Sequence, residues 1–260
     1  MAVATDIFDL TGKVALLTGA SKGMGLAMAE GLAEHGARVV VSSRKLDQCE
    51  AACEQINANC GTEAAVPVAC NIGYKEQLEE LVAQTRERLG PIDILVANAG
   101  VNPYYGPMSE IPDSAFDKIM NSNVRSNHWL AQMVAADMVA AGGGSMMITA
   151  STGAFMPSLT LGTYAISKLA DIALVRNLAL EYGPSGIRVN AICPGLIKTD
   201  FARALWDNEG AKRNAETNTP LRRLGEADDL KGIAVFLASP ASSYITGQAI
   251  AVCGGTHMWR

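Results

Sequence analysis

The feature that most constrains the fold is a glycine-rich turn placed between an apolar run and a helix-forming stretch. Residues 13–18 (K-V-A-L-L-T) form the apolar run, and residues 19–25 (G-A-S-K-G-M-G) form the turn. An alanine-rich stretch over 26–35 predicts a helix, and residues 38–42 (R-V-V-V-S) predict a second buried strand. This order predicts a β-α-β unit whose turn and helix N-terminus can receive a phosphate group.

The alternation of strands and helices continues to the end of the chain. Further strands are predicted at 64–69, 92–97, 145–150, 187–192 and 249–252, and helices at 46–59, 75–89, 114–140, 163–182 and 227–238. This pattern is typical of an α/β fold with a doubly wound, Rossmann-type parallel sheet of about seven strands and helices on both faces. No repeat or linker divides the sequence, so we expect a single domain over 1–260.

One segment departs from this pattern. Residues 200–220 are mostly polar but include Phe201 and Trp206, and they lie between two prolines. A long irregular connection in a compact domain is often a functional loop. We therefore expect a substrate lid over 200–220.

Composition and charge exclude several other classes of protein. The chain is 49% hydrophobic and 18% charged, as in a well-packed globule, and its net charge of −5 gives no reason to expect nucleic-acid binding. No apolar run approaches the ~20 residues of a membrane span, and residues 1–9 lack a secretory pattern. We expect a cytoplasmic location. The six cysteines contain no C-x-x-C pair and the histidines are isolated, so we expect no metal site.

A tyrosine and a lysine four residues apart are the clearest chemical feature. Tyr164 and Lys168 would share one face of the helix predicted at 163–182. A free tyrosine has a pKa near ~10, and a neighbouring cation lowers it by stabilising the phenolate. This pair can therefore provide a general acid/base, although the same spacing also occurs by chance on amphipathic helices.

Several motifs at fixed positions support the chemical interpretation. The turn reads T-G-x-x-x-G-x-G, Asn98-Ala99-Gly100 follows the strand at 92–97, and Pro194-Gly195 follows the strand at 187–192. Ser151 precedes Tyr164 by thirteen residues. Together these motifs resemble the short-chain dehydrogenase/reductase family over residues 10–255.

The resemblance implies a catalytic group of four residues. Tyr164 would exchange a proton with a carbonyl or alcohol oxygen, and Lys168 would lower its pKa and contact the nicotinamide ribose. Ser151 would hold the substrate oxygen, and Asn123 would anchor a water that links the lysine to solvent. Read locally, Ser151 could instead cap a turn, and Asn123 could be a buried helix asparagine that bonds the backbone.

Asn121 and Asn127 flank the preferred asparagine. The N-V sequence context favours Asn123 over both of them.

The cofactor prediction rests on the end of the second strand. Residues 42–45 (S-S-R-K) contain no carboxylate for an adenosine ribose, whereas Ser43, Arg44 and Lys22 could bind a 2'-phosphate. The alternative is a solvated basic loop. We expect NADP(H), and the resemblance implies the cofactor-binding residues Gly19, Ser21, Lys22, Gly23, Met24, Gly25, Ser43, Arg44, Lys45, Asn71, Ile72, Asn98, Ala99, Gly100, Tyr164, Lys168, Pro194, Gly195, Ile197 and Thr199.

Three positions differ from the family pattern. Asn71 replaces an aspartate that contacts adenine, Ala97 replaces the first asparagine of N-N-A-G, and Cys253 replaces the aspartate of V-D-G-G. We expect the first two to alter cofactor binding without abolishing it. The sequence offers no physical account of Cys253.

The substrate prediction is a neutral ketone or secondary alcohol, because the candidate pocket is mostly apolar. By position, the expected lining residues are Val101, Asn102, Ser151, Thr152, Phe155, Leu196, Phe201 and Trp206. The resemblance also implies a homotetramer or homodimer built from the helices at 114–140 and 163–182. Alternatives are an enoyl reductase, epimerase or dehydratase on the same scaffold, or a module that senses NADP(H) without turnover.

Overall fold

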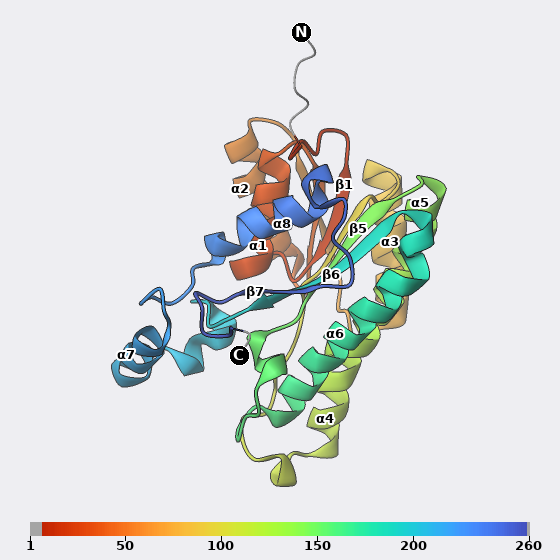
Figure 1. The fold of residues 1–260 in the computed structure, drawn as a ribbon. Helices are drawn as coiled ribbons and strands as arrows, with labels where there is room; N and C mark the ends of the chain where they lie inside the picture. The colour runs from red at the N-terminus through yellow and green to blue at the C-terminus, as the bar shows by residue number, and fades with distance from the viewer. Residues whose placement is uncertain (1–6, 259–260) are drawn as a thin grey trace.

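The computed structural model describes residues 7–258, so the first six residues, part of the stretch read for a secretory signal, lie outside the described residues. Seven parallel strands form one sheet in the order β3-β2-β1-β4-β5-β6-β7 (Figure 1). The order reverses beside β1, where open α/β sheets bind ligands. The strands are β1 Val14–Thr18, β2 Arg38–Ser43, β3 Ala65–Ala69, β4 Ile94–Ala97, β5 Gly144–Thr149, β6 Ile187–Pro194 and β7 Ala249–Val252.

Helices cover both faces of the sheet, as the sequence predicts (Figure 1). One face carries α1 (Gly23–Glu34), α2 (Leu46–Cys60) and α8 (Lys231–Ala238), and the other carries α3 (Lys75–Leu89), α5 (Ser126–Ala140) and α6 (Gly162–Tyr182). Successive residues of a strand point alternately into the two cores, one on each face of the sheet. Leu16 packs in the core with α3, α5 and α6, whereas its neighbour Leu17 packs in the core with α1 and α8. Burial on both faces explains why the strands read as continuous apolar runs.

The helix predicted over 114–140 is interrupted. It consists of α4 (Asp113–Met120), a π-helical segment over Asn121–Arg125, and α5, and the backbone stays right-handed helical through both junctions. A π segment inserts an extra residue into a turn and is common at functional sites. Here it contains Asn123, whose side chain is fully buried. The periodicity of the sequence did not reveal this change of helix type.

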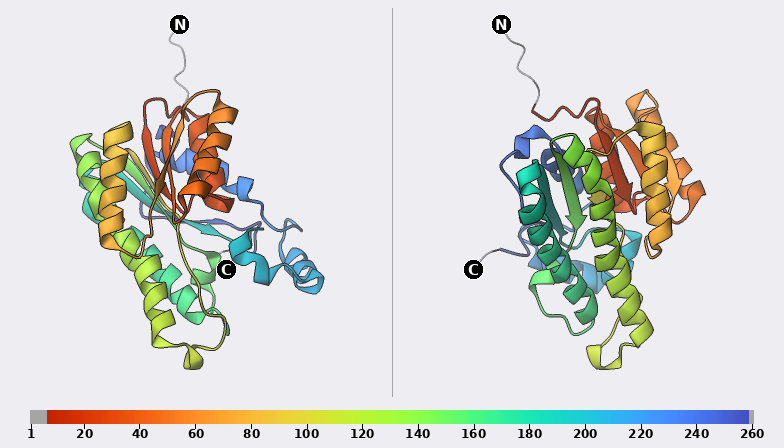
Figure 2. Two further views of the ribbon diagram at one scale, coloured as in Figure 1. Left: turned by 180° about the vertical axis from the view of Figure 1, so that it is seen from behind. Right: turned by 90° about the vertical axis from the view of Figure 1, so that its right-hand side faces the viewer.

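The segment predicted as an irregular lid contains helical structure. A 3-10 helix spans Asp200–Leu205, and α7 spans Glu209–Asn218. The indole of Trp206 donates to the carbonyl of Thr199 at 3.3 Å, which ties the segment to the end of β6. Figures 1 and 2 show α7 projecting from the body of the molecule.

The parallel sheet brings all functional segments to one edge. The carboxyl ends of the strands point to the end of the molecule where α4, the loop after β5 and the segment with α7 lie (Figure 2). Residues separated in sequence therefore meet there, as in other α/β proteins. In the part of the chain that the structure describes, no helix is long and apolar enough to cross a membrane.

Candidate active site

Tyr164 and Lys168 lie on one face of α6, as predicted. The helix begins at Gly162, so Tyr164 is in its first turn and Lys168 follows one turn later. The Lys168 Nζ lies 5.9 Å from the centroid of the Tyr164 ring, and only 4% of the lysine side chain is exposed. The Ser151 hydroxyl lies close enough to the Tyr164 phenol to lower its pKa. The structure thus brings three of the four predicted catalytic residues together.

Ser151 combines the two roles that the sequence offered as alternatives. It follows β5 and caps a 3-10 helix over Thr152–Phe155, and its Oγ accepts from the Gly153 N–H at 3.0 Å. The turn cap fixes the position of the oxygen that lies near Tyr164. A turn-capping serine is therefore compatible with a serine that holds a substrate oxygen.

Asn123 makes backbone contacts, as its alternative interpretation predicted. Its Oδ1 accepts from the Val101 N–H at 2.8 Å, and its Nδ2 donates to the Val101 carbonyl at 3.0 Å and to Ser167 Oγ at 3.0 Å. These bonds join the π segment, the loop after β4 and α6. The role of Asn123 as a water anchor stays a prediction.

The pKa of Tyr164 is shifted upward, whereas the sequence predicted a downward shift. Burial raises the pKa of Tyr164, and this effect exceeds the lowering by the Lys168 charge and the Ser151 hydroxyl. The lysine acts in the predicted sense, but desolvation outweighs it. Burial alone would lower the pKa of Lys168, but the Asp171 carboxylate, together with Tyr164 and Cys193, holds it above its ordinary value.

Asp171 is the residue that the sequence analysis missed. Its carboxylate is fully buried and lies 3.0 Å from Lys168 Nζ. Its other oxygen accepts from Asn127 Nδ2 at 3.0 Å, so the asparagine rejected in favour of Asn123 also belongs to the site. The available signal was spacing, because a residue at i+3 from Lys168 shares its helix face.

The glycine turn forms a cradle of the predicted kind. Gly19 has a φ of +63°, and an added Cβ would lie 2.8 Å from the Cα of Ala99. At Gly25 an added Cβ would lie 2.2 Å from the Gly19 carbonyl oxygen. Asn98 Nδ2 donates to the carbonyls of Thr18 and Gly19 at 3.2 and 3.0 Å, which locks the turn to the end of β4. Only glycine fits such close contacts.

The cradle fits a dinucleotide. The N-cap of α1, Lys22, makes no side-chain cap, so the first amides of the helix remain available to an anion. Beside it, the buried oxygens Ser42 Oγ and Asn98 Oδ1 have no hydrogen-bond partner among the described residues. Unpaired buried acceptors at this point of the sheet are consistent with a polar ligand.

The predicted 2'-phosphate site is only partly assembled. Arg44 and Lys45 are exposed just beyond β2, and Ser43 Oγ lies 3.2 Å from Cys49 Sγ. Lys22, however, is paired with Asp200 at 2.8 Å at the start of the lid segment. The structure therefore places Lys22 on the lid side of the glycine turn, which differs from the role expected of it.

Two of the three departures from the family pattern, Asn71 and Cys253, have local explanations. Asn71 Oδ1 accepts from the Gly73 N–H at 3.1 Å, a turn that an aspartate would also make. Cys253 Sγ accepts from the His257 N–H at 3.4 Å. Burial alone would raise the pKa of the Cys253 thiol, but nearby backbone N–H groups bring it below its usual value. Cys253 thus caps the final turn, as an aspartate would.

Other predicted cofactor residues lie near the end of β6. Pro194 ends that strand, Gly195 packs against Cys253, and Ile197 is buried in the core with α1 and α8. The Thr199 methyl would be 3.2 Å from a Cβ at Gly23, so Thr199 lies against the glycine turn.

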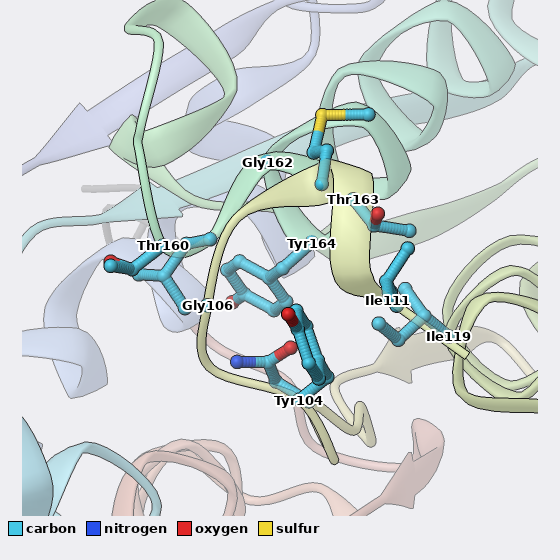
Figure 3. Close-up of a pocket in the computed structure, with 11 residues that line it drawn as sticks. Tyr104, Gly106, Ile111, Ile119, Thr160, Gly162, Thr163 and Tyr164 are labelled. Carbon is cyan, nitrogen blue, oxygen red and sulfur yellow. The ribbon is translucent and has the colours of Figure 1, made fainter.

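The cleft next to Tyr164 differs from the predicted pocket. Of the predicted residues, Asn102 lines it and Phe201 packs near Tyr164, with ring centroids 6.1 Å apart. Figure 3 shows Tyr104, Ile111 and Ile119 facing Tyr164 across the cleft. The lining residues that the sequence missed are Tyr104, Gly106, Met108, Ile111, Ile119, Thr160, Leu161, Gly162 and Thr163.

Several predicted pocket residues lie elsewhere. Leu196 lines a separate cavity with Arg223 and Cys253. Phe155 stacks on His257 with ring centroids 4.4 Å apart. The Thr152 hydroxyl donates to the Pro194 carbonyl at 3.2 Å. Sequence position alone did not separate these side chains, because three loops meet at the same edge.

Two further observations describe the chemistry of the surroundings. Within residues 7–258 no three His, Cys, Asp or Glu side chains are grouped to hold a metal ion. The six cysteines are free thiols.

Comparison with known proteins identifies the family. A family model described as enoyl-(acyl carrier protein) reductase matches residues 19–257. Dehydrogenase/reductase SDR family member 4 of Oryctolagus cuniculus is 42% identical over 246 residues, covering 95% of this chain and 94% of the relative. The chain belongs to the short-chain dehydrogenase/reductase family, and it is an oxidoreductase that acts on CH-OH or C=O groups.

Two solved structures share the fold closely. A gluconate 5-dehydrogenase from Burkholderia cenocepacia, in complex with NADP and tartrate, is 32% identical with a TM-score of 0.92, covering 98% of both chains. A 7α-hydroxysteroid dehydrogenase, complexed with NADH and 7-oxo glycochenodeoxycholic acid, is 36% identical with a TM-score of 0.92, covering 97% of both chains. These structural relatives thus bind either NADP or NADH.

Proposed function

We propose that this enzyme interconverts a ketone and a secondary alcohol with NADP(H), using Tyr164 as general acid/base. The observation that carries the proposal is the grouping of the Tyr164 phenol with the Ser151 hydroxyl and the Lys168 ammonium at the sheet edge that holds the glycine cradle. A bound nicotinamide supplies or accepts the hydride. Tyr164 gives its proton to the carbonyl oxygen in reduction and takes it back in oxidation.

The remaining residues support that proton transfer. Ser151 donates to the substrate oxygen as negative charge develops on it. Lys168 stabilises the phenolate that remains after Tyr164 has given up its proton. Because burial holds the pKa of Tyr164 above its ordinary value, the phenol is protonated at neutral pH. This state favours carbonyl reduction near neutrality and alcohol oxidation at higher pH.

NADP(H) is the proposed cofactor because the end of β2 presents cations and no carboxylate. Ser43, Arg44 and Lys45 follow the buried strand, and the guanidinium of Arg44 can bind a phosphate with paired hydrogen bonds. Lys22 would join them by leaving Asp200, a step that costs little because both side chains are well exposed.

The proposed substrate is neutral and partly apolar. The cleft at Tyr164 is lined by Tyr104, Met108 and Ile111 together with small and neutral polar residues, and none of its lining residues is charged. Residues 200–220 would act as a lid, since Phe201 packs near Tyr164 and the segment continues into α7, which projects from the body of the molecule (Figure 1). A carboxylated or phosphorylated substrate would lack a cationic partner in this cleft.

We also propose a homotetramer or homodimer in the cytoplasm. Exposed apolar side chains of α6, including Ile166, Leu169 and Leu180, would be covered by a second copy. Sedimentation of the purified protein and fractionation of the native cell test these two proposals.

Turnover assays test the proposed reaction. Ketones and secondary alcohols of graded size are screened for a change in NADPH absorbance, and an enoyl thioester is included because the matching family model bears an enoyl reductase description. Reduction of a neutral ketone, lost in Tyr164→Phe, is the expected result. Activity on the thioester alone would favour an enoyl reductase. Tight NADPH binding without any turnover would favour a sensing module.

A further inference from the structure

Asp171 is a buried carboxylate placed directly behind the proposed catalytic pair. The Lys168 ammonium contacts it at 3.0 Å, and the two side chains are 4% and 0% exposed. A second N–H of the ammonium is donated to the Thr149 carbonyl of β5 at 2.7 Å. An ammonium has three N–H groups. One therefore remains for the phenol or a ligand.

The carboxylate is itself held from a second helix. Asn127 of α5 donates to its other oxygen at 3.0 Å, and the same amide nitrogen donates to the Asn123 carbonyl at 2.6 Å. A hydrogen-bonded chain thus runs from Lys168 through Asp171 and Asn127 to the π segment. Both carboxylate oxygens have donors, as a buried charge requires.

We propose that Asp171, anchored by Asn127, is a positioning residue that keeps the Lys168 ammonium charged and sets the ionisation of the Tyr164–Lys168 pair. This inference rests on the proposed function, because Asp171 acts only through Lys168 and touches no reacting atom.

The groups facing Lys168 make this role specific. On α6 they are Tyr164 and Asp171, and on β6 the thiol of Cys193, whose pKa burial raises to about 12. Asn123 of the π segment and Asn127 of α5 face Lys168 from the neighbouring helix, and both side chains are neutral amides. Among the described groups that act on Lys168, Asp171 is thus the one carboxylate. Burial raises the pKa of Asp171, whereas Lys168 and Asn127 favour its charged form.

The direction of the effect follows from charge balance. With Asp171 ionised, the carboxylate, ammonium and phenol together carry no net charge, and losing a proton leaves them with one net negative charge. Without that carboxylate the set is a cation, and losing a proton makes it neutral. Removing the Asp171 charge therefore lowers the apparent pKa of the Tyr164–Lys168 pair, a value that belongs to both groups together.

Asp171→Asn tests this prediction because it keeps the shape of the side chain and removes its charge. In alcohol oxidation, measured with the best alcohol of the screen, the acidic limb of kcat/KM is expected to move to lower pH by about one unit or more. The plateau is expected to fall as well, because part of the pair then loses its proton from Lys168 instead of Tyr164.

A second readout needs no turnover. NMR of the protein with isotope-labelled lysine follows the protonation of Lys168, whose resonance is assigned by its loss in Lys168→Met. In Asp171→Asn, Lys168 is expected to lose its proton at lower pH than in the parent.

A matched control is Asp137→Asn. Asp137 of α5 pairs with Arg86 at 2.9 Å, so its variant also removes one helix carboxylate from an ion pair. Its pH limb and Lys168 resonance are expected to stay in place. If Asp171→Asn does not fold, Asn127→Leu with Asp171→Leu removes the carboxylate together with the amide that holds it and is expected to move the limb in the same direction.

Two failures are distinguishable. Suppose that Tyr164→Phe is inactive but that Asp171→Asn shifts neither the acidic limb nor the titration of the Lys168 resonance. This result would overturn the positioning role of Asp171 and leave the proposed function intact. Full activity in Tyr164→Phe would overturn the proposed function itself.

Discussion

Two lysine–aspartate pairs at the cofactor edge have nearly the same length and very different surroundings. Lys168 and Asp171 lie 3.0 Å apart with side chains 4% and 0% exposed, whereas Lys22 and Asp200 lie 2.8 Å apart with 63% and 61% exposed. Water screens the exposed pair, so it can break when a ligand arrives. The buried pair cannot lose one partner without leaving a charge unpaired. Burial, and not distance, decides which pair can control an ionisation.

The two pairs also differ in the pH range over which each of them stabilises the protein. The Lys22 hydrogen bond and charge lower the pKa of Asp200, so this pair contributes stability above the carboxyl's ordinary pKa and loses it in acid. Across neutral pH the exposed pair is therefore constant. Burial opposes the charge of Lys168, but Asp171, together with Tyr164 and Cys193, holds the pKa of Lys168 above its ordinary value, so this stabilisation is lost only as alkaline pH deprotonates the lysine.

The largest effect is expected from a substitution that removes the proton donor next to the buried pair. Tyr164→Phe removes one oxygen and leaves packing nearly unchanged, so cofactor affinity is expected to persist while kcat falls by a factor on the order of 10² or more. Steady-state kinetics and NADPH fluorescence titration measure the two quantities. A kcat within a few-fold of the parent would refute the acid/base role.

The next effect concerns the exposed cations at the end of β2. Ser43→Asp with Arg44→Ala places a carboxylate beside the proposed phosphate site and is expected to lower the NADPH to NADH ratio of kcat/KM by roughly two orders of magnitude, mainly through KM. Kinetics with both cofactors on the parent come first, because a parent that prefers NADH refutes the assignment. An unchanged ratio in the double variant would move the phosphate site to Lys22 or Lys45.

A smaller effect tests the buried cation directly. Lys168→Met keeps the stem and loses the charge, so the apparent pKa of activity is expected to rise, opposite to the shift expected for Asp171→Asn. NADPH affinity is expected to fall by roughly tenfold, measured by calorimetry, because one charge-assisted contact is lost. Unchanged NADPH affinity would remove the ribose contact from the proposal.

The smallest effect belongs to the exposed pair. Asp200→Asn frees Lys22 from its partner, and we expect the KM for NADPH to change less than about threefold and the melting temperature to stay within error. Salt titration of the parent is the matched comparison, since screening should mimic the variant. A loss of turnover as large as that expected for Tyr164→Phe would show that the pair holds the lid in an active position.

The fold was predictable because its determinants are local. Buried parallel strands read as apolar runs, and the glycine turn has contacts that exclude side chains, so periodicity and family resemblance predicted a doubly wound parallel sheet of about seven strands. The order of the strands came from the structure. The π segment was not predictable, because Asn121–Arg125 differs from an α-helix by one inserted residue and no sequence pattern marks it. The substrate cleft was predicted only in part, since Tyr104 and Met108 reach Tyr164 through a loop whose path is set by packing.

The sequence by itself determined which chemical groups this protein carries and which of them share a helix face. Tyr164 and Lys168 point the same way because any helix of this spacing places them so. Tertiary structure decided how those groups are charged. Helix spacing alone places Asp171 beside Lys168, but packing buries the pair and brings Asn127 of α5 to hold the carboxylate. Lys22 meets Asp200 across 178 residues. Ionisation depends on desolvation and on neighbours from other elements, and both exist only once the chain is packed.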